Sequence, residues 1–266
     1  MLLSSLYRYP LKSGAAEAIG EAHNDELGLI GDRRWMVVDA ATGKFLTQRV
    51  LPNMALLKAT WSGEDSLRLD APGMQSISIA RPELSAERGV VIWREAVRAL
   101  DAGDEAGRWL TRLLQRPCRL VYLPTEYGIQ VDPAFAEIGD RTAFSDGFPF
   151  LLVGQASLDD LSRRVGRPMD MRRFRPNLVV SGADAYAEDG WRRIRIGDLE
   201  FRVVKPCSRC VITTIDPLTA ERSPDREPFT TMTTYRKGEG GVFFGQNLIP
   251  ESTGYLKVGM TVEVLE

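Results

Sequence analysis

Short apolar runs separated by turn residues occupy the first hundred positions of the chain. The runs are rich in Val, Ile, Leu and aromatic residues, and Gly, Pro, Asn and Asp lie between them, a pattern typical of strands. The runs are 2–11, 33–47, 54–61, 66–71, 75–80, 89–93 and 96–101. A hairpin connection is expected at 39–44. Strands this short and this regularly spaced favour a barrel or a curled sheet over a parallel α/β core.

An apolar stripe with helical spacing follows this region. It consists of Ala106, Trp109, Leu110, Leu113 and Leu114, which fall on one face of a helix. Asp104 and Glu105 suit the positive N-terminal end of a helix, and Pro117 stops it. The sequence therefore predicts a helix that begins near Asp104 and ends before Pro117.

A second helix is expected after a buried strand at 148–153. Ser157 and Asp160 match a capping box, and Gly166 suits the C-terminal cap. The apolar face of this helix would consist of Leu158, Leu161 and Val165. Before the strand, residues 124–148 are polar and rich in turn residues, so we expect a long loop there.

The remaining apolar runs predict further strands. They are 177–182, 192–204, 211–216, 241–250 and 255–266. Gly197 and Asp198 form a plausible two-residue turn within the second of these runs. We therefore expect a mainly β protein with two parts: a β-barrel-like N-terminal domain over 1–99, and a larger β-rich domain with a few peripheral helices over 100–266.

Composition and charge narrow the classes of function. The chain has 266 residues, 44% hydrophobic and 26% charged, with a formal net charge of −2, which gives no general support for nucleic-acid binding. Three cysteines indicate a reducing compartment rather than a disulfide framework. The start lacks a signal peptide, and no apolar span approaches about 20 residues. We expect a cytoplasmic protein that is not a membrane protein.

Histidine chemistry is disfavoured because the chain contains only His23. A catalytic triad or a multi-histidine metal site would have to depend on this one imidazole. Its place in a polar turn after an apparent strand favours a structural role.

The stretch 205–219, "KPCSRCVITTIDPLT", contains two of the three cysteines, Cys207 and Cys210. The β-branched run that follows favours a strand, so the helix dipole of a thioredoxin-type motif is missing. A structural zinc site would need every other candidate ligand in the chain, Cys118 and His23. Both interpretations are therefore weak.

The cations beside this pair are more informative. Lys205 and Arg209 would stabilise a thiolate, which is a soft ligand for a heavy metal. On a strand, Ser208 and Cys210 would share one face, so the two cysteines need not be equivalent. Two buried, inert cysteines on a core strand remain the structural alternative.

Basic residues beside polar partners recur in turn-like settings. The pairs are Lys12 with Ser13, Arg33 with Arg34, and Arg175 with Asn177. Each alone is typical of a solvated surface charge, but together they offer what a phosphate group needs. The sequence has no Walker A pattern and no G-x-G-x-x-G, so ordinary nucleotide binding is not indicated.

Six motifs occur in the order and spacing of a known family. They are "YPLKSG", "GDRRWMVVD", "FRPNLVVSG", "PCSRCVITTIDPLT", "FGQNL" and "LKVGMTVEV". The chain resembles proteins in which an N-terminal β-barrel precedes a MOSC domain, a β-barrel named after the C-terminal domain of molybdenum-cofactor sulfurase. Within them it is similar to the branch that reduces amidoximes and N-hydroxylamines. The resemblance covers nearly the whole chain.

This resemblance implies a molybdenum enzyme that uses a molybdopterin cofactor. The cysteine after the arginine of the C-x-R-C block, Cys210, would ligate molybdenum, and Cys207 would be a neighbour. The positions that would hold the cofactor are Lys12, Ser13, Arg33, Arg175, Asn177, Ser208 and Arg209, with Asn247 nearby. Asp216 is a candidate for orienting a metal-bound water or relaying protons, with a turn-forming role as its alternative.

Two departures from the family pattern matter. Phe148 stands where relatives have a polar cofactor contact, so that hydrogen bond is expected to be absent. Too few cysteines remain for an iron–sulfur cluster, so electrons would come from a separate ferredoxin-, flavodoxin- or cytochrome-type protein. The family description also carries pyridoxal phosphate binding as a minor expectation.

The expected function is the reduction of small N-hydroxylated compounds, such as hydroxylaminopurines and amidoximes. Two other classes remain open. A non-catalytic carrier of the molybdenum cofactor would use the same basic pocket. A sulfur-transfer protein would carry a persulfide on Cys210 or Cys207 and need no metal.

Overall fold

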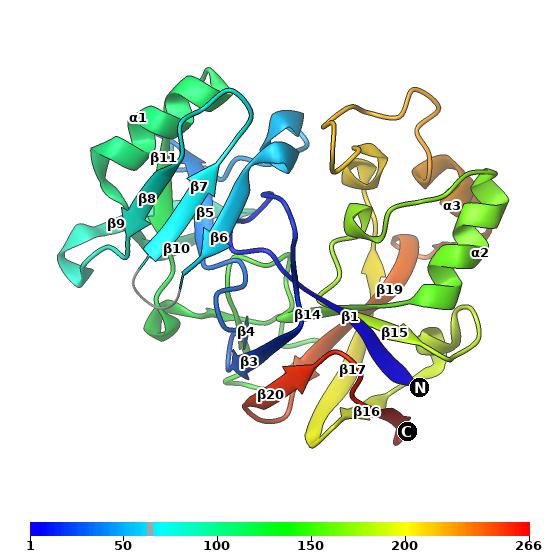
Figure 1. Cartoon of the computed structure of the whole chain (residues 1–266). Helices are drawn as coiled ribbons and strands as arrows, with labels where there is room; N and C mark the ends of the chain where they lie inside the picture. The colour runs from blue at the N-terminus through cyan, green and yellow to red at the C-terminus, as the bar shows by residue number, and fades with distance from the viewer. Residues whose placement is uncertain (63–65) are drawn as a thin grey trace.

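The computed structural model describes residues 1–62 and 66–266 as two lobes. One lobe consists largely of residues 35–123, and the other consists of the first eight residues together with residues 150–266 (Figure 1). Both termini lie on the second lobe. The chain therefore starts in one lobe, builds the other, and returns.

A nine-stranded sheet forms the second lobe. Its strands are β1 (Leu2–Arg8), β2 (Glu17–Ile19), β14 (Phe150–Gly154), β15 (Leu178–Ser181), β16 (Arg193–Ile196), β17 (Leu199–Ser208), β18 (Lys237–Gly238), β19 (Gly241–Pro250) and β21 (Val262–Val264). The order is β2-β1-β15-β14-β19-β17-β16-β21, with β18 paired to β19. A bridge between Leu2 and Thr261 links β1 to the start of β21, so the sheet closes into a barrel.

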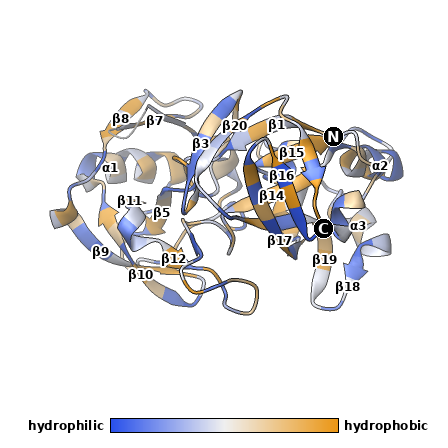
Figure 2. Ribbon diagram, turned by 90° about the horizontal axis from the view of Figure 1, so that it is seen from below, coloured by the Kyte–Doolittle hydropathy of each residue, from blue (hydrophilic) through white to orange (hydrophobic). Residues whose placement is uncertain are grey.

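Alternating side chains divide this barrel into an inside and an outside. Leu152 and Leu178 face the barrel core, while their neighbours Val153 and Val179 face the helices, as the two-residue period of a strand requires. The helices are α2 (Gln155–Val165) and α3 (Phe229–Tyr235). Figure 2 shows the hydrophobic stretches of β14 and β15 that this arrangement buries.

The first lobe packs two antiparallel sheets and one helix. Its strands are β5 (Trp35–Asp39), β6 (Lys58–Trp61), β7 (Ser66–Asp70), β8 (Ile77–Ala80), β9 (Glu87–Ile92), β10 (Glu95–Asp101) and β11 (Cys118–Tyr122). The sheets have the orders β5-β11-β10-β9 and β6-β7-β8. The apolar stripe of α1 (Gly103–Leu114) packs between them, against residues such as Val37 and Leu69.

Short elements complete the structure. The remaining strands are β3 (Glu21–Asp25), β4 (Gly28–Leu29), β12 (Ile129–Gln130), β13 (Arg141–Thr142) and β20 (Gly254–Lys257). The 3-10 helices are η1 (Pro52–Leu56), η2 (Leu84–Ala86), η3 (Thr125–Tyr127), η4 (Met171–Arg173), η5 (Ala187–Gly190) and η6 (Val211–Thr214). The stretch 124–148 therefore contains three short elements within its loop. Across the described ranges, no helix is both long and apolar enough to span a membrane.

The structure confirms the mainly β class and several local predictions. The hairpin at 39–44 forms, with Val38 bridged to Phe45, and Gly197–Asp198 is the turn between β16 and β17. The first helix occupies its expected position. Strand β10 extends across the expected boundary at residue 99. The division of the chain into domains of residues 1–99 and 100–266 stays a prediction.

Three local predictions were wrong. Residues 211–214 form the 3-10 helix η6 instead of a strand, because β17 already ends at Ser208. Ser157 caps no helix, since α2 begins at Gln155 and the Ser157 hydroxyl instead donates to the buried carboxylate of Glu188 at 2.7 Å. Trp93 lies in the turn between β9 and β10 rather than in a strand.

Candidate functional site

A cavity of about 370 Å³ lies between the two lobes. Nine of the ten residues selected from the sequence line it: Lys12, Ser13, Arg33, Arg175, Asn177, Ser208, Arg209, Cys210 and Asn247. Both lobes and distant parts of the sequence therefore contribute to one wall. Asp216 is absent from this lining.

Backbone geometry sets the lining apart from the rest of the fold. Four of its residues have a positive φ: Ser13 at 63°, Arg33 at 48°, Trp93 at 54° and Arg175 at 57°. A non-glycine residue in this left-handed region costs about 1–3 kcal/mol, and such residues concentrate at functional sites. The surrounding structure therefore holds these side chains where relaxed backbone would not place them.

Two guanidinium groups form the base of the cavity. Arg33 donates to Asp32 at 2.5 Å and to the Oδ1 of Asn177 at 3.0 Å. Arg175 donates to the carbonyl of Gly14 at 2.6 Å. The two guanidinium carbons lie 4.5 and 4.3 Å from the centre of the Tyr9 ring, so one aromatic side chain supports both cations.

A buried lysine adds a third cation. The ammonium of Lys12 donates to the carbonyl of Phe144 at 2.8 Å and to the carboxylate of Asp146 at 2.5 Å. Burial lowers the pKa of Lys12, although Asp146 opposes that shift. Desolvation favours the neutral carboxyl of Asp146, but the charge of Lys12 outweighs it and lowers the pKa of Asp146 to about 2. Asp146 thus offsets the charge of Lys12, as Asp32 offsets that of Arg33.

Some donors in the cavity have no partner within the described structure. The buried atoms Arg175 Nη2, Arg209 Nε and Ser145 Oγ make no hydrogen bond. Burial and the proximity of Arg33 also lower the pKa of Arg175 to about 10, which marks an excess of positive charge. Buried polar groups normally have partners, so these donors fit an anionic ligand that accepts hydrogen bonds.

The two cysteines have different cationic neighbours. The Sγ of Cys210 lies 3.3 Å from the Nη2 of Arg49, which comes from the first lobe. The Sγ of Cys207 lies 2.9 Å from the Nη1 of Arg209. Both thiols are half-buried and free. Neither is an inert cysteine sealed in the core, because both line the cavity.

Strand pairing explains how β17 presents its end to the cavity. Lys205 pairs with Asn247 of β19, and the register shifts between Pro206 and Ser208. Gly241 makes this close approach possible, because a Cβ there would lie 2.5 Å from the Oγ of Ser208. The chain then leaves the sheet, and Cys210 becomes the residue before η6. Thus a strand end fixes the thiol.

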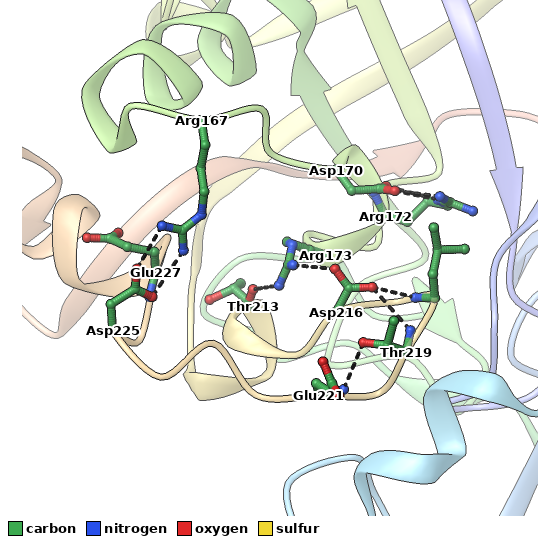
Figure 3. A network of polar contacts seen from close by, with 11 residues as sticks. Arg167, Asp170, Arg172, Arg173, Thr213, Asp216, Thr219, Glu221, Asp225 and Glu227 are labelled. Carbon is green, nitrogen blue, oxygen red and sulfur yellow. Dashed lines mark hydrogen bonds and ion pairs between the residues drawn. The ribbon is translucent and has the colours of Figure 1, made fainter.

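Asp216 has the turn-forming role that was the alternative for it. Its carboxylate accepts a hydrogen bond from Arg173 at 2.6 Å and from the backbone N–H groups of Leu218 and Thr219 (Figure 3). Arg173 also donates to the carbonyl of Thr213 in η6. The carboxylate is therefore occupied outside the cavity, which favours the turn-forming role, and a catalytic role for Asp216 stays a prediction.

Sequence reasoning missed several residues of the cavity, among them Arg49, Trp93 and Asp146. Each lies in a polar loop or turn, where a single sequence gives no signal that distinguishes it from other surface residues. Phe148 also lines the cavity and meets Phe135 edge to face, with ring centres 6.3 Å apart. The side chain of Phe148 therefore presents an apolar ring to the cavity at this position.

Comparisons with known proteins agree with the two-part architecture. The family model described as MOSC N-terminal beta barrel domain matches residues 1–117, and the MOSC domain model matches residues 139–263. The mitochondrial amidoxime-reducing component 1 of Homo sapiens is 33% identical, over 99% of this chain and 82% of its own. The component 1 of Danio rerio is 34% identical, over 98% and 84%.

A second type of relative matches over the same extent. The mitochondrial amidoxime reducing component 2 of Rattus norvegicus is 33% identical, over 97% of this chain and 81% of its own. These matches span both lobes and the cavity between them. The chain therefore belongs to the family of proteins that join a MOSC N-terminal beta barrel domain to a MOSC domain, the family of the amidoxime-reducing components.

Proposed function

We propose that this protein binds a molybdenum–molybdopterin cofactor in the cavity and reduces small N-hydroxylated compounds, with electrons from a separate protein. MOSC domains are known to bind the molybdenum cofactor. The relatives are named for amidoxime reduction, which supports the reaction class. The observation that carries the proposal is the half-buried Cys210 thiol beside a cluster of buried cations with unpartnered donors.

The cations of the cavity suit the anionic part of such a cofactor. Lys12, Arg33 and Arg175 would hold its phosphate, because guanidinium forks and a lysine point charge are the usual partners of phosphate oxygens. Ser13, Ser208 and Asn177 would add short polar contacts, with Arg209 and Asn247 at the same wall. Asp146 would then share Lys12 with the phosphate.

Cys210 would ligate the metal through its thiolate, which is a soft donor suited to a heavy metal. The guanidinium of Arg49 lies 3.3 Å from this sulfur. When bound, the cofactor supplies the two-electron chemistry. The overall reaction takes two electrons and two protons, breaks the N–O bond of the substrate, and releases water.

The test compares two matched cysteine variants. Cys210→Ser and Cys207→Ser are assayed with a chemical reductant and either benzamidoxime or hydroxylaminopurine. Substitution of a residue that only supports a metal ligand lowers metal affinity or activity about 10- to 100-fold. Loss of the ligand itself should have a larger effect, so the activity of Cys210→Ser is expected to fall by more than about 100-fold. Cys207→Ser is expected to retain activity. Equal loss in both variants would contradict the assignment of Cys210.

The same protein preparation distinguishes the proposed reductase from its two alternatives, a cofactor carrier and a sulfur-transfer protein. A carrier would bind molybdenum and show no turnover with any reductant. A sulfur-transfer protein would carry one added sulfur atom on a cysteine, and the contact between Arg209 and Cys207 makes Cys207 the thiol to inspect. Mass spectrometry of freshly purified protein detects that atom.

A further inference from the structure

Trp93 occupies an unusual position for a large aromatic residue. It is the first residue of the two-residue turn between β9 and β10, where Ile92 pairs with Glu95. The favoured turns of this length need a positive φ at that place, and glycine or asparagine usually provides it. Trp93 adopts a φ of 54°. The turn thus contains a tryptophan at a position whose backbone conformation favours glycine or asparagine.

The indole is exposed, and it faces the cavity. Trp93 retains 50% of its surface and lines the same cavity as Cys210. Other large apolar side chains of residues 1–62 and 66–266 are as exposed, such as Leu84 and Ile138, but they lie away from this cavity. The exposed ring therefore belongs to a concave wall rather than to an outer face.

Neighbouring side chains fix the ring beside the thiol. Phe45 meets the indole edge to face, with ring centres 5.0 Å apart. The guanidinium of Arg49 lies 4.8 Å from the indole centre, and the same guanidinium lies 3.3 Å from the sulfur of Cys210. One side chain thus contacts both the ring and the thiol, so the indole and Cys210 belong to the same part of the cavity wall.

We propose that Trp93 is the substrate-stacking residue of this site and selects planar, delocalised N-hydroxylated compounds. This inference rests on the proposed function, because it concerns the substrate of the same cavity. A flat π-system gains by stacking on an indole whatever its hydrogen-bonding edge, whereas a small compound without a ring gains nothing. Arg49 lies between the ring and the thiol, where it donates hydrogen bonds to the N–O group of a stacked ligand.

The test uses the full-length, molybdenum-loaded protein with three variants. Trp93→Ala removes the ring, Trp93→Phe keeps a smaller ring, and Leu84→Ala removes an equally exposed side chain outside the cavity. Two probes are compared: hydroxylaminopurine, which is planar and aromatic, and hydroxylamine, which has no ring. Stacking of a base on an aromatic side chain corresponds to about 5- to 150-fold in affinity.

Trp93→Ala is expected to lower kcat/KM for hydroxylaminopurine by about 10-fold or more, in the range of base stacking. With hydroxylamine, kcat/KM should change less than about twofold, and Trp93→Phe should restore most of the lost activity. Leu84→Ala should resemble wild type with both probes. An equal loss with both probes would overturn the proposal.

Calorimetric binding of adenine, a planar base that is not reduced, tests the inference without turnover. Weaker binding to Trp93→Ala than to Leu84→Ala supports the stacking role even where the wild type turns over neither probe, a result that would remove only the proposed reaction. Equal adenine affinity in the two variants would overturn the stacking role itself.

Discussion

At the scale of single residues, the site is built from strained backbone and unpartnered charge. Ser13, Arg33 and Arg175 all combine a positive φ with a place in the lining. Each conformation costs about 1–3 kcal/mol, which the fold elsewhere must offset. For the proposed anionic cofactor this backbone would be a form of pre-organisation, because the lining residues are held in place before a ligand binds.

Ser13 offers a direct measure of this strain. Within residues 1–62 and 66–266 its carbonyl accepts a hydrogen bond from Gln48 but its hydroxyl makes none, so substitution removes no side-chain partner there. Glycine usually destabilises relative to alanine by about 0.5–1 kcal/mol, but a φ of 63° reverses the order. We expect Ser13→Gly to be more stable than Ser13→Ala by about 1 kcal/mol in urea unfolding. A more stable alanine variant would show that the backbone is not strained.

Asp146 gives the stability of the protein a dependence on acid pH. Its folded pKa of about 2 lies below the ordinary value of 3.8, so the ionised carboxylate stabilises the fold above that ordinary value. This contribution is lost as the pH falls toward 2. Because 59% of the side chain is exposed, solvent screens the effect.

The matched variant is Asp146→Asn, which keeps the shape and removes the charge. Its deficit in urea midpoint relative to wild type should shrink as the pH falls from about 6 to about 3. A deficit that stays constant over this range would show that the Lys12 contact is not electrostatic.

The local sequence could identify the cationic residues of the cavity, but not the residues from distant parts of the chain that join them there. Lys12, Arg33 and Arg175 stand in motifs with a proline or a polar partner, and the resemblance gave them an expected role in holding the cofactor. Arg49 reaches Cys210 only because the two lobes pack together, and Asp146 reaches Lys12 across 134 positions of the chain. The residues next to Arg49 and Asp146 in the sequence give no indication of these contacts.

At the scale of elements, η6 is the part that positions the thiol. Arg173 of η4 contacts both Thr213 and Asp216, and so joins the turn after Cys210 to a neighbouring element. The side chain of Arg173 is only 9% exposed, so the carboxylate of Asp216 is needed to stabilise its positive charge. Figure 3 shows how the guanidinium points toward η6 and the Asp216 turn.

Two variants at Asp216 distinguish structure from catalysis. Asp216→Asn keeps one oxygen for the backbone N–H groups of the turn but loses the ion pair with Arg173, so the free energy of unfolding should fall, while kcat and molybdenum content of the folded protein should stay close to wild type. Asp216→Ala leaves a buried donor unpaired and should lower the free energy of unfolding by about 1–3 kcal/mol. If Asp216→Asn were fully stable but lost most of its kcat, a proton-relay role would replace the structural one.

Elements whose determinants are local were predictable, and those decided by distant contacts were not. The stripe of α1 and the turn at 39–44 contain their own signals. The β-branched run at 211–215 favours a strand, yet β17 already ends at Ser208 and residues 211–214 form η6. Ser157 matches a cap, but Glu188, thirty-one positions away, takes its hydroxyl.

At the scale of the whole molecule, the lobes are interleaved. β1 lies in the barrel of the second lobe, where Leu3 and Leu6 are buried in its core. β20, near the end of the chain, pairs with β3. The cavity has walls from both lobes, so neither half contains the complete site.

This interleaving predicts that the halves do not fold alone. A fragment of residues 118–266 lacks β1 and leaves the edge of β15 and two core positions open, so it should be insoluble or lack a cooperative unfolding transition. Co-expression with residues 1–117 should restore a soluble complex. Cooperative unfolding of the isolated 118–266 fragment, measured by circular dichroism, would show that the barrel closes without β1.

The most direct measurement is the molybdenum content per chain, determined by mass spectrometry of the metal. The wild type and Cys207→Ser, purified from a host that makes molybdopterin, should each contain about one molybdenum atom per chain. Cys210→Ser, and wild type from a host without molybdopterin synthesis, should contain almost none. Full molybdenum in Cys210→Ser, or none in wild type from the competent host, would contradict the account.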